Sequence, residues 1–166
     1  NKINSLVELF FKKYEEQKSL TNNSFLKWLK IDNNHFLTWE QVQSNICILS
    51  EYLRKNLSTG DRCVLLSENR PEWLIADIAI MNAGGVTVPL FTTYSEKDYE
   101  YILNDCRPKI CIVSNNIQFN KLKKFISDNT KVLSIENFSD KIESVENILD
   151  KYNNQKSISV FEDFNQ

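Results

Sequence analysis

Two polar segments carry the residues whose types could do chemistry, and each directly follows an apolar run. Glu68, Asn69 and Arg70 follow the first run, and the hydroxyl-rich residues 92–95 follow the second. Ligands of a doubly wound α/β sheet bind beyond the carboxyl ends of its strands, so a site is expected at these segments first. Neither segment contains a nucleophile beside a base, a pair of carboxylates or a set of metal ligands.

The hydroxyl cluster at residues 92–95 has the composition of a phosphate site but lacks the mechanism of one. Phosphate loops use glycines so that backbone N–H groups can approach the anion, and the three glycines of this chain all lie elsewhere. Ser95 with Asp98 three residues later forms the capping-box signature of a following helix. We therefore predict a helix cap here and not a phosphate site.

The other candidates are one arginine, one histidine and four cysteines. Arg70 could hold an anion, but a surface arginine at a helix start is the commoner role. His35 lies in a polar turn without a nucleophile pattern, so no catalytic role is expected. The cysteines form no CxxC pair and no zinc-ligand spacing, which predicts reduced thiols in a cytosolic protein. We expect three of them to be buried: Cys47, Cys63 and Cys111. No catalytic, cofactor-binding or metal-binding residue is assigned within the chain.

Composition excludes several classes of function. The 166 residues are 42% hydrophobic and 25% charged, as in an ordinary soluble globular protein. The 20 basic and 22 acidic residues give a net charge of −2, without the basic stretch that nucleic-acid binding requires. We found neither a stretch of 18 apolar residues nor a signal peptide, so the sequence predicts no transmembrane segment and no export signal.

Residues 61–91 form the clearest strand–helix–strand unit. Apolar runs at 63–67 and 86–90 predict two strands buried on both faces. Between them, Pro71 suits the first position of a helix, and Gly84-Gly85 suits its end. Such βαβ units are right-handed, so the two strands should lie parallel in one sheet.

The same alternation continues along the chain and predicts an α/β fold, a parallel βαβ sheet with helices on both faces. The further strands are expected at 110–114 and 131–135. The helices are expected near 71–83, 96–104 and 117–127. Residues 1–135 would form this α/β subdomain, and residues 136–166 a weakly structured connection with a short helix around 145–152 and a last strand at 157–161.

The N-terminal third is expected to be two helices and a hairpin. An apolar stripe after Ser5 predicts a first helix that ends near Lys13 or Gln17 and docks on a protein core, with a membrane surface as the alternative partner. A turn at 32–35 would join two short strands. Thr38 with Gln41 predicts the start of a second helix of about 17 residues that Gly60 ends.

A family resemblance covers about residues 37–135. The N-terminal region of the AMP-forming long-chain fatty acyl-CoA synthetases, members of the adenylate-forming ligase superfamily, is similar to four segments in the same order. These are LTWEQV at 37–42, GDRCVLLSENRPEWLIADIAIMNAGGVTVPLF at 60–91, TTYSEKDY at 92–99 and YILNDCRPKICIVS at 101–114. The succession SENRPEW, AD and VTVPL is specific to the long-chain branch, whereas AGG is shared across the superfamily.

The resemblance implies an enzyme that activates a fatty acid with ATP to an acyl-adenylate, releases pyrophosphate and passes the acyl group to coenzyme A, with Mg²⁺. The family's phosphate loop, similar to YTSGTTG, and its later glutamate, aspartate and lysine motifs do not occur in this sequence. The resemblance therefore implies an N-terminal portion of the ligase's large N-terminal domain that is inactive alone and exposes enough apolar surface to self-associate. A homodimer and a peripheral membrane contact at the cytoplasmic face are further options.

The sequence leaves two alternatives open. The chain could be a non-catalytic binding or scaffolding domain, because fold-level analogy does not establish chemistry. It could also belong to an adenylate-forming ligase that uses another carboxylate or stops at the acyl-adenylate.

Overall fold

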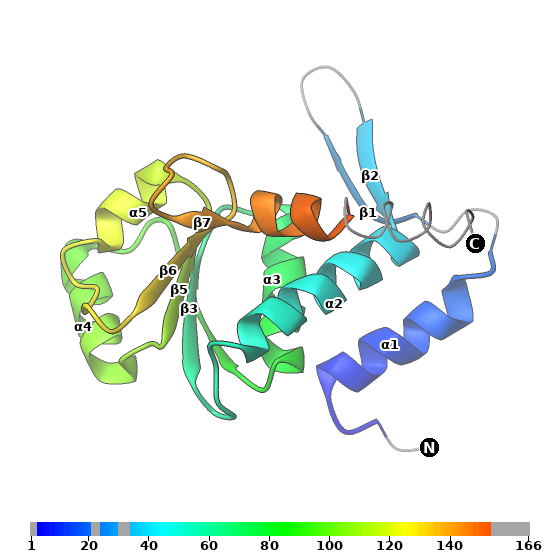
Figure 1. The fold of residues 1–166 in the computed structure, drawn as a ribbon, viewed down its shortest axis with the longest axis horizontal. Coiled ribbons are helices and arrows are strands. Elements are labelled where there is room, and N and C mark those ends of the chain that lie inside the picture. The colour runs from blue at the N-terminus through cyan, green and yellow to red at the C-terminus, as the bar shows by residue number, and fades with distance from the viewer. Residues whose placement is uncertain (1–2, 21–23, 30–33, 154–166) are drawn as a thin grey trace, which may run out of the picture. The chain divides into compact units, whose positions relative to one another are not determined.

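The computed structural model of the protein describes residues 3–20, 24–29 and 34–153 (Figure 1). These residues divide into two compact units. The first comprises residues 1–61 and 68–87, and the second comprises residues 62–67 and 88–166.

The first unit holds three helices and a hairpin. In chain order its elements are α1 (Leu6–Gln17), β1 (Ser24–Leu29), β2 (Asn34–Thr38), α2 (Trp39–Arg54) and α3 (Pro71–Asn82). Phe10 of α1 is buried, with its ring centroid 5.8 Å from that of Phe25 and 5.7 Å from that of Trp39. The apolar stripe of α1 thus docks on protein, as predicted.

Side-chain caps start these helices where the sequence indicates. Ser5 Oγ accepts a hydrogen bond from the N–H of Glu8 at the start of α1. Thr38 and Gln41 form a reciprocal capping box at the start of α2. The prediction that Gly60 ends α2 is wrong, because the helix already ends at Arg54.

His35 is a strand residue, which corrects its predicted place in a turn. It lies in β2 opposite Trp28 of the antiparallel partner β1. Pairing with β1 overrides the turn preference of the polar sequence around this residue.

A polar network joins α2 to α3 inside the first unit. Asn82 Nδ2 donates to Ser50 Oγ at 3.0 Å, and Ser50 Oγ donates to the carbonyl of Ile46 at 2.6 Å. Arg54 also donates to the backbone carbonyl of Asn82, at 2.9 Å. Ser50 is fully buried, so its hydroxyl depends on these partners.

We expect Asn82→Ala to destabilise the protein by about 1–3 kcal/mol, because it leaves the buried Ser50 hydroxyl without its donor. Urea denaturation followed by circular dichroism measures the change. Asn120 is the matched control, since it is exposed and its amide bonds to Asn116 on the same helix. Asn120→Ala should change the free energy of unfolding by less than about 0.5 kcal/mol. Equal losses in the two variants would contradict the role of the Asn82–Ser50 contact.

The parallel sheet contains five strands, and helices flank it. The strands are β3 (Arg62–Leu66), β4 (Val86–Leu90), β5 (Ile110–Val113), β6 (Lys131–Ser134) and β7 (Glu143–Ser144). The second unit also holds the helices α4 (Glu96–Cys106) and α5 (Asn116–Leu122), whereas the first two residues of β4 belong to the first unit. Their order across the sheet is β4-β3-β5-β6-β7. Parallel registers pair β3 with β5, β5 with β6 and β6 with β7. The N–H of Val86, at the start of β4, donates to the carbonyl of Asp61, just before β3. The predicted α/β fold is confirmed.

The core of the second unit lies between one face of the sheet and the helices α4 and α5. Its fully or nearly fully buried members are Val64, Leu66, Leu90, Tyr99, Leu103, Cys111, Val113 and Leu122. Alternate residues of each strand reach this core, as the side-chain period of a strand requires. Helix α5 is shorter than predicted, but Phe125 and Ile126 beyond its end still pack against the same core.

Strand β4 is an edge strand and is only partly buried, which corrects the prediction that it is buried on both faces. Only Leu90 is buried along the strand, and Val86 is 49% exposed. The position of Pro89 fits this place, because proline lacks an N–H and is tolerated in edge strands. The sequence pattern could not distinguish an edge strand from a central strand, since strands of both kinds can be rich in β-branched residues.

The segment after β6 adds the short strand β7 and a helix at residues 145–153. The strand was not predicted, whereas the helix was, and its Val145 and Ile148 are buried. The last strand expected at 157–161 lies outside the described residues.

Candidate functional site

The two polar segments that follow β3 and β4 belong to different units. Glu68, Asn69 and Arg70 lie in the first unit, and residues 92–95 lie in the second. Glu68 and Asn69 are exposed, and Arg70 occupies the N-cap position of α3. Each segment is therefore a separate candidate site.

Arg70 is paired with a carboxylate of its own helix. Its Nε atom donates to Glu72 Oε2 at 2.9 Å, and both side chains are partly buried. An anion would have to compete with Glu72 for the guanidinium group. This geometry favours the structural role predicted for Arg70 over anion binding.

Residues 92–95 serve as a helix cap. The N–H and the hydroxyl of Ser95 both donate to Asp98 Oδ2, at 2.9 and 2.6 Å, and the Asp98 N–H donates back to Ser95 Oγ. The hydrogen bonds from Ser95 lower the pKa of Asp98 below its ordinary value. With Asp98 and Glu96 both in the first turn, the start of α4 is negatively charged and disfavours phosphate. The predicted cap is confirmed.

A second set of contacts fixes the backbone of the same loop. Tyr99 Oη donates to the carbonyl of Phe91 at 2.8 Å, and Lys121 Nζ donates to the carbonyl of Thr92 at 2.7 Å. Burial raises the pKa of Tyr99 above its ordinary value. Lys124 forms an exposed ion pair with Glu96. Sequence analysis missed both lysines: Lys121 lies in the last turn of α5, and Lys124 lies just beyond the end of that helix.

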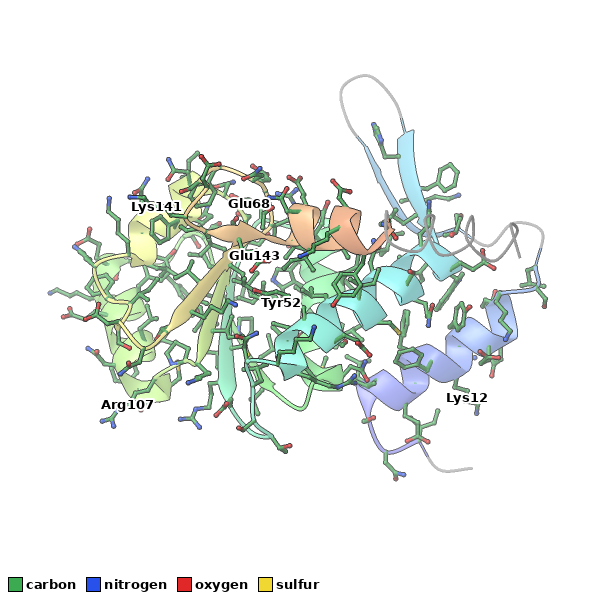
Figure 2. The ribbon with its side chains drawn as sticks, in the orientation of Figure 1. Lys12, Tyr52, Glu68, Arg107, Lys141 and Glu143 are labelled. Atoms are coloured by element: carbon green, nitrogen blue, oxygen red, sulfur yellow. The ribbon has the colours of Figure 1, made fainter. Side chains whose placement is uncertain are left out.

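Arg107 is the one residue other than glycine with a positive φ angle in the described part of the chain, at 43°. Unusual backbone angles often mark functional sites. Here the residue ends α4, with its N–H donating to the carbonyl of Leu103, and Figure 2 shows its side chain pointing outward at the end of that helix. The conformation is therefore explained by helix termination before Pro108.

All four cysteines are thiols. Cys63 and Cys111 are completely buried, as predicted, but Cys47 and Cys106 are only half-buried. The prediction that Cys47 is buried is therefore wrong, because its position on α2 lies beside the buried stripe and not within it. Burial raises the pKa of Cys111 far above the ordinary value of a thiol.

We expect a thiol reagent to modify Cys47 and Cys106 in the native protein, and to reach Cys63 and Cys111 only after unfolding.

The raised pKa of Cys111 should make the free energy of unfolding depend on pH, because above about pH 8.5 the unfolded thiol ionises while the folded one stays protonated. Its contribution to stability is complete below that pH and is lost as the pH rises. Denaturation at pH 8 and 10 measures this loss, which Cys111→Ala should reduce. If Cys111→Ala lost as much free energy of unfolding between pH 8 and pH 10 as the unchanged protein, the loss would not come from the Cys111 thiol.

Within its described residues the chain offers neither a metal-ligand cluster nor a helix that could span a membrane. These residues contain no group of three or more His, Cys, Asp or Glu side chains able to hold a metal. The part of the chain that the structure describes also has no helix long and apolar enough to cross a membrane.

Comparison with known proteins places the chain in a family. Residues 13–162 match the sequence profile of the family described as AMP-binding enzyme. The chain belongs to the AMP-binding enzyme family. The long-chain-fatty-acid–CoA ligase ACSBG1 of Rattus norvegicus is 30% identical over 77 residues, which are 46% of this chain and 11% of that protein. The long-chain-fatty-acid–CoA ligase FadD15 of Mycobacterium bovis is 43% identical over 49 residues, which are 30% of this chain and 8% of that protein. The resemblance to AMP-forming long-chain acyl-CoA synthetases is confirmed.

Solved structures of adenylate-forming ligases share the fold. The anthranilate CoA ligase AuaEII, solved with anthranoyl-AMP, superposes with a TM-score of 0.72 at 19% identity, over 87% of this chain and 27% of that chain. The luciferase-like enzyme of Zophobas morio gives 0.72 at 21% identity, over 87% and 33%. The chain thus spans about a tenth of the curated relatives and about a third or less of these solved relatives.

Proposed function

We propose that this chain is part of an AMP-forming long-chain fatty acid–CoA ligase. The complete protein would use ATP to convert a fatty acid to an acyl-adenylate with release of pyrophosphate, and would then transfer the acyl group to coenzyme A. One observation carries the proposal. The chain matches the AMP-binding enzyme family over residues 13–162, and segments of it are 30–43% identical to proteins named long-chain-fatty-acid–CoA ligases.

The described residues would serve this ligase as a structural portion of its N-terminal domain. They supply neither a glycine-rich phosphate loop nor a metal-ligand cluster, so the groups that bind ATP and Mg²⁺ would come from another part of the protein. Residues 1–135 would form the α/β subdomain, and residues 136–166 the connection to the remainder. We place the enzyme in the cytoplasm, in keeping with its reduced thiols.

A ligase for another carboxylate is the second candidate. The fold is compatible with it, because an anthranilate CoA ligase shares the architecture with a TM-score of 0.72 at 19% identity. Fold alone does not choose between a fatty and an aromatic carboxylate.

The test is a substrate panel on the full-length gene product with ATP, Mg²⁺ and coenzyme A. The panel would contain saturated fatty acids of increasing length beside anthranilate and benzoate, and mass spectrometry would identify the thioester product. We expect fatty acyl-CoA and AMP in equal amounts with the long-chain acids. Thioester formation with the aromatic acids alone would support the second candidate and contradict the first.

A further inference from the structure

Two large apolar side chains of the second unit, Phe91 and Ile117, are each 68% exposed. They flank one contact, in which Lys121 Nζ donates to the carbonyl of Thr92. Phe91 immediately precedes Thr92, and Ile117 lies one turn before Lys121 on the same side of α5. The exposed side chains thus belong to one region, where the loop after β4 meets α5.

The exposed ring of Phe91 is held in place. The carbonyl of Phe91 accepts hydrogen bonds from Tyr99 Oη at 2.8 Å and from the Tyr94 N–H at 3.3 Å. Its ring contacts the Tyr94 ring edge to face, with centroids 5.3 Å apart, and Tyr94 in turn packs against the core. An aromatic ring fixed in this way loses little conformational entropy when another surface covers it, which is typical of an interface anchor.

We propose that Phe91, Tyr94 and Ile117, named the Phe91 patch, form the surface on which a later part of the same polypeptide packs. This inference rests on the proposed function, under which the chain belongs to a longer ligase. The extent of the solved relatives favours that occupant, because this chain covers only 27–33% of two of them, and a ligase of their length would have most of its residues outside this chain. The patch is apolar, and its neighbouring ammonium group of Lys121 is already bonded to Thr92, which suits a protein surface better than an anion.

Side-chain packing, and not strand addition, is the expected mode of contact. The Val86 N–H points toward the Asp61 carbonyl beside β3, so by alternation Thr87 and Pro89 direct their backbone toward the outer edge of β4. Pro89 has no N–H, which interrupts the row of donors that an added strand would need.

Hydroxyl-radical footprinting of the full-length gene product tests the proposal without requiring activity. Tyr101, 71% exposed on α4, is the internal control. Relative to the urea-unfolded protein, Phe91 and Ile117 should be oxidised at least about threefold more slowly than Tyr101, as for side chains in the core of an interface. Equal protection factors would overturn the proposal. Protection that disappears on dilution to the monomer would also overturn it, because the occupant would then be a second copy.

A pair of variants of the full-length protein gives an independent measurement. Phe91→Ser should lower the midpoint of thermal unfolding by at least about 2 °C, whereas Tyr101→Ser should leave it within about 1 °C. Equal shifts would contradict a covered Phe91. Both readouts are structural, so an inactive full-length protein would count against the proposed ligase and not, by itself, against the packing of this patch.

Discussion

Residues 1–166 alone are expected to form no acyl-adenylate, whereas the full-length gene product should form it readily. Adenylation requires the carboxylate to be held in line with the α-phosphorus while donors neutralise the charge of the departing pyrophosphate. The sequence of this chain contains no glycine-rich phosphate loop, and its described residues hold no metal cluster. Losing both contributions removes rate enhancements that typically exceed about 10⁶-fold, so the residual rate should equal the background.

The measurement is release of AMP and pyrophosphate from ATP with Mg²⁺, coenzyme A and a fatty acid, with both proteins assayed side by side. Circular dichroism of the 1–166 preparation is the control, because only a folded sample makes its inactivity informative. Turnover above background by folded residues 1–166 would show that an active site lies within them, and it would contradict the proposal that ATP and Mg²⁺ bind to another part of the protein.

Truncation of Tyr99 should be among the most damaging single changes to stability. The side chain is 1% exposed in the core between α4 and the sheet, and its hydroxyl bonds to the carbonyl of Phe91. Tyr99→Ala removes a large buried ring and should cost about 3–5 kcal/mol in the free energy of unfolding, measured by urea denaturation. Tyr101 on the same helix is 71% exposed, and Tyr101→Ala should cost less than about 0.5 kcal/mol.

A third variant separates the ring of Tyr99 from its hydroxyl. Tyr99→Phe keeps the packing and loses one hydrogen bond, so it should cost about 0.5–1.5 kcal/mol. The Tyr94 N–H still donates to the Phe91 carbonyl in that variant, which limits the loss. Similar losses for Tyr99→Ala and Tyr101→Ala would show that the core does not depend on Tyr99 as its burial indicates.

Local signals predicted the elements of the fold well, because each has a physical cause within a few residues. Pro71 and Gly84 bound α3, and Gly84 has the positive φ angle of 90° that favours glycine. Asn115 caps α5 by accepting hydrogen bonds from two backbone N–H groups of the first turn. The capping boxes at Thr38 and Ser95 likewise start α2 and α4 where they were expected.

Features that depend on distant partners were not accessible from the sequence. The edge position of β4 and the addition of β7 both follow from which strands lie side by side. The contact of Lys121 with the Thr92 carbonyl joins residues 29 positions apart. For the candidate site, the sequence correctly favoured a cap over a phosphate loop at Ser95, because that choice depends on neighbouring residues only.

The central claim is that the complete protein is an adenylate-forming ligase, and isotope exchange between pyrophosphate and ATP tests it most directly. This exchange reports adenylation alone and needs no coenzyme A. For the full-length gene product we predict exchange that depends on an added long-chain fatty acid and disappears when the acid is omitted. No exchange with any carboxylate by a folded full-length protein would contradict the claim and favour a non-catalytic scaffold.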